Sequence, residues 1–309
     1  MLRGTFLYLS EQPRIFAFIR GNRLARRLAS RFVAGETMDS AVIAVRELNG
    51  RGIAASLDLL GESVTSTGEA RASSATVVQM LERISAEKLD CNVSVKLTQL
   101  GLDLDHGLCV ENMRSILNRG RDLGISVRID MESSEHTQRT LDFFEQDMLP
   151  VYGDRVGIVI QSYLRRSAAD IDRLIGVRAR VRLCKGAYQE PATLAFPDKA
   201  DVDRSYVELI EKLLERGHQP AVATHDPALI AHVRRFVETK GIAADRFEFQ
   251  MLYGIRRDLQ EDLRRAGFRV RVYVPFGTQW YPYLMRRLAE RPANLAFILG
   301  NVVKESLRA

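Results

Sequence analysis

The chain has 309 residues, 46% of them hydrophobic and 27% charged, with a formal net charge of +6 at pH 7. This composition is typical of an ordinary soluble globular protein and excludes a disordered or fibrous chain. The sequence contains neither the roughly 20-residue apolar run that spans a bilayer nor an opening signal-peptide pattern.

The first 49 residues are expected to form a helical region packed on the domain that follows. Its arginines lie among apolar residues at helical spacing, Arg14, Arg20, Arg23, Arg26, Arg27 and Arg31 among Phe16, Phe18, Ile19, Leu24 and Leu28. Such a basic amphipathic segment either caps a core or contacts a membrane surface, and the pattern favours neither role. Nucleic-acid binding would need aromatic residues interleaved on the exposed face, and these aromatics follow the apolar stripe instead.

From residue 50 onward, short runs rich in β-branched residues alternate with helical segments. The expected strands are 53–60, 92–97, 125–131, 156–161, 180–185, 220–225, 247–252 and 269–276. The expected helices are 76–87, 110–123, 137–149, 168–175, 203–216, 228–239, 256–266, 280–290 and 294–305. Eight strands in this alternation are what a closed (βα)8 barrel requires, so we assign residues 50–309 to one α/β catalytic barrel.

Polar side chains stand at the C-terminal end of nearly every expected strand, where barrel enzymes carry their chemistry. In chain order they are Asp58 and Glu62, Lys96, Asp130, Gln161, Arg182 and Lys185, Thr224 and His225, Glu248 and Gln250, and Tyr273. We interpret this rim as a binding site. Its cations Lys96, Arg182, Lys185, Arg286 and Arg287 outnumber the acids Asp130 and Glu62, which predicts an anionic ligand that includes a phosphate.

The helix expected at 280–290 has a polar face of its own. Tyr283, Arg286, Arg287 and Glu290 follow the i, i+3, i+4, i+7 spacing and therefore share one side. Alone, this face is typical of a solvated salt bridge. Its place after the eighth strand favours a lid over the barrel mouth, with two guanidinium groups that bind one small carboxylate.

Metal chemistry and disulfides are not expected. The three cysteines, Cys91, Cys109 and Cys184, form no C-x-x-C pair, which predicts buried structural thiols in a reducing cytoplasm. Only His225 among the histidines ends an expected strand, and no metal-ligand motif accompanies it. A Schiff-base barrel that uses Lys96 or Lys185 is the alternative, although it leaves the paired arginines unexplained.

Five segments together carry a family resemblance. They are Asp58-Leu-Leu-Gly-Glu62, Arg182-Leu-Cys-Lys-Gly-Ala-Tyr188, Ala223-Thr-His-Asp226, Phe247-Glu-Phe-Gln-Met-Leu-Tyr-Gly254 and Tyr283-Leu-Met-Arg-Arg-Leu-Ala-Glu290. They resemble the motifs of proline dehydrogenase, in its short monofunctional bacterial type. The resemblance implies a distorted (βα)8 barrel that binds FAD noncovalently, oxidises L-proline to Δ1-pyrroline-5-carboxylate and passes electrons to membrane ubiquinone or menaquinone.

The resemblance also implies roles for single residues. Lys96, Arg286 and Arg287 would hold the proline carboxylate, Tyr273, Tyr283 and Leu252 would line its ring, and Glu62 would pair with Arg286 to close the pocket. The flavin would contact Asp130, Met131, Gln161, Arg182, Lys185, Gly186, Ala187, Tyr188, Thr224, His225 and Glu290. We further expect a cytoplasmic protein with peripheral contact at the inner membrane face, transient contact with pyrroline-5-carboxylate dehydrogenase, and no nucleic-acid partner.

Overall fold

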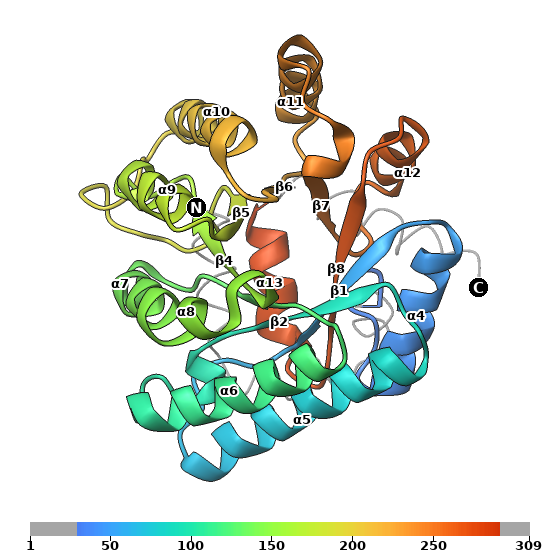
Figure 1. The fold of residues 1–309 in the computed structure, drawn as a ribbon, viewed down its shortest axis with the longest axis vertical. Helices are drawn as coiled ribbons and strands as arrows, with labels where there is room; N and C mark the ends of the chain where they lie inside the picture. The colour runs from blue at the N-terminus through green and yellow to red at the C-terminus, as the bar shows by residue number, and fades with distance from the viewer. Residues whose placement is uncertain (1–29, 291–309) are drawn as a thin grey trace, which may run out of the picture.

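A closed barrel of eight parallel strands forms the centre of the molecule (Figure 1). The computed structural model describes residues 30–290, with side chains to residue 285. The strands are β1 Ala54–Leu59, β2 Cys91–Val95, β3 Val127–Ile129, β4 Val156–Gln161, β5 Arg180–Cys184, β6 Ala221–Ala223, β7 Glu248–Leu252 and β8 Val270–Phe276. Ala55 pairs with Cys91 on one side and with Val272 on the other, which closes the barrel. The predicted (βα)8 barrel is confirmed.

Helices follow the strands and form an outer ring (Figure 1). They are α5 Thr67–Ala86, α6 His106–Asp122, α7 Ser134–Asp142, α8 Leu149–Tyr152, α9 Ser167–Gly176, α10 Lys199–Arg216, α11 Pro227–Lys240 and α12 Arg257–Arg265. α11 begins one residue before its expected start at 228, because Asp226 accepts from the Ala228 N–H and Pro227 takes the first position. The predicted start at residue 76 was wrong for α5. Its first turns are small and polar and carry no apolar period, and Ser66 caps them by accepting from the Glu69 N–H.

The helix predicted at 137–149 is divided into three parts. α7 runs into a π-helical segment, η2 Phe143–Met148, and then into the short α8. The wider π turn buries Phe143, Phe144 and Met148 completely. Pro150 follows in the first turn of α8, where its missing N–H is tolerated. An apolar period of 3.6 cannot reveal such an inserted residue.

Helix α13 Trp280–Glu290 lies over the barrel mouth, within the ring of outer helices in Figure 1. Its first turns form an apolar cluster with Phe32, Val33, Leu60 and Ile255. Leu60 follows β1 and Ile255 follows β7, so the cluster lies at the C-terminal ends of the strands. The lid position predicted for this helix is confirmed.

The outer place beside β8 and β1 is taken by α4 Met38–Gly50, which precedes the barrel in the sequence. In a regular barrel the eighth helix would lie there. The presence of α4 in the place of the eighth outer helix is how this barrel departs from the regular (βα)8 fold. The segments 1–29 and 291–309, with the helix expected at 294–305 and the basic N-terminal segment, lie outside the described residues, so the domain boundary after residue 49 stays a prediction.

The interior of the barrel is polar, although such interiors are ordinarily filled by branched apolar side chains. Buried residues that alternate with the apolar outer face are Ser56, Ser94, Arg128, Arg182, Glu248 and Gln250. Toward the N-terminal ends of the strands, Arg271 contacts Glu248 at 3.0 Å and donates to the carbonyl of Ala55 at 2.7 Å. Polar groups inside a barrel must satisfy one another, because no bulk water reaches them.

Arg128 crosses the inner face of β4 and β5. Its Nη1 donates to the carbonyl oxygens of Ile158 and Arg180 at 3.3 and 2.5 Å. A Cβ at Gly157 would lie 2.6 Å from that nitrogen. Glycine is therefore required at Gly157 so that a guanidinium can lie flat against β4.

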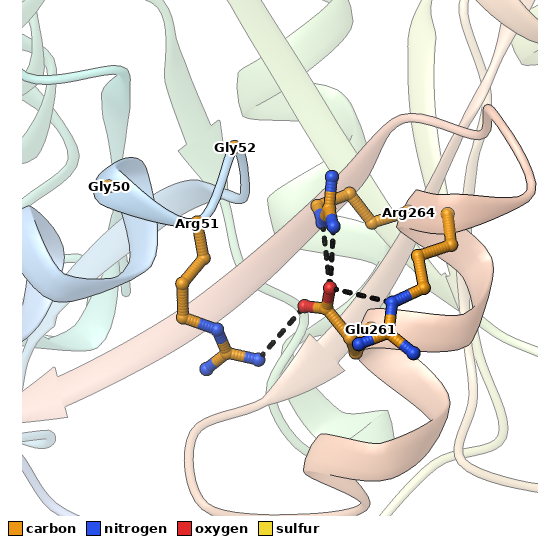
Figure 2. A pocket seen from close by; sticks show the side chains of 6 residues that line it. Gly50, Arg51, Gly52, Glu261 and Arg264 are labelled. Atoms are coloured by element: carbon orange, nitrogen blue, oxygen red, sulfur yellow. Dashed lines mark hydrogen bonds and ion pairs between the residues drawn. The ribbon is translucent and has the colours of Figure 1, made fainter.

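On the opposite face from the mouth, Glu261 of α12 gathers three arginines beside an open cavity of about 610 Å³ (Figure 2). The carboxylate contacts Arg264 at 2.5 Å, Arg265 at 3.2 Å and Arg51 at 3.3 Å. Arg51 directly follows α4, so this exposed cluster joins α12 to the chain that enters the barrel.

Candidate active site

Two buried ion pairs lie at the mouth of the barrel. Lys96 Nζ is 2.8 Å from Asp58 Oδ1, and Arg182 Nη1 is 2.8 Å from Asp130 Oδ1. The other oxygen of Asp130 accepts from the Tyr273 hydroxyl at 2.6 Å, and the Arg182 guanidinium lies 5.3 Å from the centre of the Tyr273 ring. Asp130 thus orients both a cation and an aromatic ring, which come from different strands.

The environment of Lys96 favours its ammonium form. Burial alone would lower the pKa of Lys96, but the carboxylates of Asp58 and Asp130 outweigh burial and raise it. The charge of Glu62, on the loop after β1, acts in the same direction. A Schiff-base lysine needs the opposite shift, so the structure removes the main support for that use of Lys96.

Gln161 of β4 and Arg182 of β5 each have one buried polar atom without a hydrogen-bond partner among residues 30–285. The Gln161 amide nitrogen donates to the carbonyls of Met131 and Glu132 at 3.4 and 3.2 Å, while its Oε1 is buried and unpartnered. Arg182 Nε is likewise buried and unpartnered. An acceptor and a donor at neighbouring strand ends fit a ligand that offers both kinds of group.

The loop after β5 depends on Gly186. This residue has φ of +113°, and a Cβ there would meet the Tyr163 ring at 2.3 Å. Only glycine allows the loop to pass so close to the ring. The half-buried Ala187 and Tyr188 follow on the same loop.

Lys185 joins that loop to α10 and α11. It contacts Asp203 at 2.5 Å and Asp226 at 3.0 Å. Lys199, at the start of α10, pairs with the same two aspartates. Two carboxylates beside Lys185 are unlike the surroundings of a Schiff-base lysine, which are apolar or cationic.

Strands β6 and β7 place His225 against the backbone of Leu252. The His225 Nε2 accepts from the Leu252 N–H at 2.8 Å, so the neutral ring carries its proton on Nδ1. The buried Thr224 hydroxyl accepts from the Asp226 N–H at 3.1 Å. These contacts fix the ends of both strands at the mouth.

The structure thus gathers most of the predicted residues at one end of the barrel. The buried ones are Lys96, Met131, Gln161, Arg182, Thr224 and Tyr283, and the half-buried ones are Glu62, Asp130, Lys185, Gly186, Ala187, Tyr188, His225, Leu252 and Tyr273. The backbone of Arg286, Arg287 and Glu290 belongs to α13. Their side chains lie outside the described residues.

The expected excess of cations stays a prediction, because the side chains of Arg286 and Arg287 lie outside the described residues. The other three cations, Lys96, Arg182 and Lys185, each face at least one carboxylate, and these carboxylates include Asp58, Asp203 and Asp226. Asp58 is among the polar strand ends predicted from the sequence, whereas Asp226 is not. Asp203 could not be found from the sequence, because it lies on a helix and reaches the rim only through folding.

Two further observations concern the described residues as a whole. No group of three His, Cys, Asp or Glu among them is arranged to hold a metal ion. Within the same part of the chain, no helix combines the length and apolarity needed to cross a bilayer. Cys91 and Cys109 are buried and Cys184 is half-buried, and burial raises the pKa of the Cys91 thiol to about 12.

The chain is similar to known proteins in both its sequence and its fold. A family profile described as proline dehydrogenase matches residues 41–299. The chain is 43% identical over 307 residues to proline dehydrogenase 1 of Bacillus subtilis (strain 168), covering 99% of this chain and 100% of that protein. It is 42% identical over 311 residues to proline dehydrogenase of Deinococcus radiodurans, with 98% of each covered. A solved structure of proline utilization A (PutA) from Bdellovibrio bacteriovorus, inactivated by N-propargylglycine, superposes with a TM-score of 0.81 at 27% identity, over 91% of this chain and 34% of that one.

Proposed function

This chain belongs to the proline dehydrogenase family and is an enzyme that oxidises proline, and we propose that it does so with noncovalently bound FAD, by transfer of a hydride from proline C5 to flavin N5. The product would be Δ1-pyrroline-5-carboxylate. The observation that carries this proposal is the arrangement of Arg182, Asp130 and Tyr273 beside two unpartnered buried polar atoms at the barrel mouth.

The residues at the mouth fit a flavin. An isoalloxazine ring carries both hydrogen-bond donors and acceptors, and the unpartnered Gln161 Oε1 and Arg182 Nε offer one of each. Because Gly186 has no side chain, the backbone of the loop after β5 can pass close to the Tyr163 ring. Asp130, Met131, Lys185, Ala187, Tyr188, Thr224, His225 and Glu290 complete the proposed cofactor site. FAD, when bound, accepts the hydride and so supplies the redox chemistry.

The substrate site is proposed beneath α13. Arg286 and Arg287, with Lys96, would hold the proline carboxylate, because guanidinium and ammonium donors match its oxygens. Asp58 occupies one of the three ammonium donors of Lys96, which leaves others for a ligand. Fixing the carboxylate would set the distance and angle between proline C5 and flavin N5. This positioning is itself a source of rate enhancement.

The ring of proline would lie against Tyr273, Tyr283 and Leu252. Asp130 accepts from the Tyr273 hydroxyl and so fixes the plane of that ring. The proline amine must be uncharged before hydride leaves C5, because its lone pair drives the departure. The apolar cluster under α13 shields this region from water, which strengthens every charge interaction beneath it.

The fixed cation is the electrostatic part of the proposal. Arg182 is 5% exposed and held by Asp130 and Ser94 at 2.8 and 3.2 Å. A preorganised cation costs no reorganisation when negative charge arrives. Arg182 would therefore stabilise the electron-rich product of hydride transfer.

Anaerobic reduction tests the proposed cofactor and reaction. We expect the purified protein, reconstituted with FAD, to be yellow and to lose its flavin absorbance when L-proline is added without oxygen. L-Alanine, which has the amine and carboxylate but no C5, is the control and should leave the spectrum unchanged. A flavin spectrum that persists with L-proline would exclude the proposal, and trapping of a carbonyl substrate by borohydride would support the Schiff-base alternative.

The carboxylate clamp is tested by Arg287→Met. Loss of a charge-assisted hydrogen bond costs about 1.5–3 kcal/mol, so we expect KM for L-proline to rise about 10- to 100-fold. Circular dichroism should show an intact fold, and Arg287→Lys should recover part of the affinity. An unchanged KM would remove Arg287 from the substrate site.

Electron transfer to membrane ubiquinone or menaquinone is proposed as the step that completes the cycle. The resemblance of the mouth motifs to proline dehydrogenases supports it, as it supports peripheral contact with the inner membrane face and transient contact with pyrroline-5-carboxylate dehydrogenase. Reoxidation of the proline-reduced protein by a short-chain quinone, followed by the return of flavin absorbance, would test the first of these.

A further inference from the structure

A hydrogen-bonded chain at the mouth joins the loops that follow β1, β2 and β3. Its centre is Thr98, the first residue of the short 3-10 helix η1 Thr98–Leu100, which is 1% exposed. The Thr98 hydroxyl accepts from the Ser63 N–H at 3.1 Å and donates to Glu132 at 2.5 Å. The other carboxylate oxygen of Glu132 accepts from the Thr98 N–H at 3.1 Å.

Glu132 fixes the direction of the Thr98 hydroxyl. An ionised carboxylate can only accept, so the single hydroxyl proton points toward it and a lone pair is left for Ser63. Glu132 is 5% exposed, and its backbone carbonyl accepts from Gln161 at 3.2 Å, which fixes its position from β4 as well. Burial raises the pKa of Glu132, while the two hydrogen bonds from Thr98 act against that rise.

The loop after β1 is held by hydrogen bonds at two points, Ser63 and Thr65. Ser63 has φ of +52°, a left-handed backbone conformation that residues other than glycine rarely adopt. At the far end, the Thr65 N–H donates to Glu69 of α5 at 2.8 Å. The residue before Ser63 is Glu62, whose charge raises the pKa of Lys96. The anchored Ser63 N–H therefore sets where Glu62 stands at the mouth.

We propose that Thr98 is a positioning residue that holds Glu62 over the substrate through the Ser63 N–H. The proposal rests on the proposed function and on the pairing of Glu62 with Arg286, which the family resemblance implies and which would close the pocket over proline. It assigns a role to a residue that does not touch the substrate. It also explains why a disfavoured backbone conformation at Ser63 persists, because the Thr98 hydroxyl offsets its cost.

Thr98→Val tests this role, because valine keeps the shape and removes the hydroxyl. We expect KM for L-proline to rise about tenfold, which is the effect of one lost hydrogen bond. The kcat should stay within about twofold of the wild-type value. Thr98→Ser should restore the wild-type KM. In a Glu62→Gln background, Thr98→Val should add little, because both changes act on the same group. Full additivity of the two effects would overturn the proposal.

Hydrogen exchange provides a readout that is independent of the reaction. In the flavin-free protein, the amide of Ser63 should exchange about tenfold faster in Thr98→Val than in the wild type. Thr140→Val is the matched control, because Thr140 is fully buried and its hydroxyl has no partner among the described residues. It should change neither exchange at Ser63 nor KM. Unchanged exchange in Thr98→Val overturns the anchoring role, whereas wild-type protein that proline does not reduce overturns only the proposed function.

Discussion

Replacement of Arg182 by methionine is expected to lower kcat for proline oxidation about 100- to 1,000-fold, the usual cost of removing one preorganised charge partner from an active site. Arg182 is held between Asp130 at 2.8 Å and Ser94 at 3.2 Å, so its charge is fixed in place before the reaction. Single-turnover reduction of the flavin by proline in stopped flow measures the effect directly. A rate within about threefold of wild type would remove Arg182 from the proposed electrostatic role.

Asp130 complicates that measurement, because Arg182→Met leaves its buried carboxylate without a cation. The double variant Arg182→Met/Asp130→Asn removes the unpaired charge and should recover stability toward urea without recovering the rate. Recovery of both would show that the single variant had failed through its fold. Arg182→Lys keeps a charge but loses the planar fork, so an intermediate rate is expected.

Glu248→Gln is expected to reduce the free energy of unfolding by about 3–5 kcal/mol, the usual cost of leaving one partner of a buried ion pair alone. Glu248 is 7% exposed and faces Arg271 at 3.0 Å inside the barrel. Urea unfolding followed by circular dichroism measures the change. Glu261→Gln is the matched control. It also removes a carboxylate from arginines, but in the exposed cluster of Figure 2, and should leave stability nearly unchanged.

The same residue gives the barrel an acid-sensitive element. Burial alone would raise the pKa of Glu248, but Arg271 and Gln250 outweigh burial and lower it from 4.5 to about 2. A lowered folded-state pKa contributes stability that is fully present above the unfolded value and is lost as the pH falls through the folded one. Unfolding free energies measured between pH 4.5 and 2 should therefore fall more steeply in the wild type than in Glu248→Gln. Equal slopes would contradict the assignment.

The order of strands and helices could be predicted from the sequence because each is a local property. An apolar period of two or 3.6 depends only on neighbouring residues. Eight such strands can form few closed arrangements, so the closed barrel could be predicted. The polar strand ends also indicated the mouth. Local pattern failed at the start of α5, whose small polar first turns carry no apolar period, and at the π turn after α7, where tertiary packing overrides the period.

The candidate site was only partly accessible to the same reasoning. Side chains such as Lys96 and Arg182 were found because strand ends converge, but their partners Asp58 and Asp130 become partners only when the barrel closes. The hydrogen-bonded chain through Thr98 could not be predicted from the sequence, because Ser63, Thr98 and Glu132 belong to three separate loops.

The sequence by itself thus determined the barrel and the kinds of group at its mouth, because period, caps and strand-end chemistry are written in consecutive residues. Only the tertiary structure decided which charges neutralise one another, why the interior can be polar, and that α4 takes the outer place beside β8 and β1. These depend on contacts between residues far apart in the chain, whose distances and burial no local pattern contains.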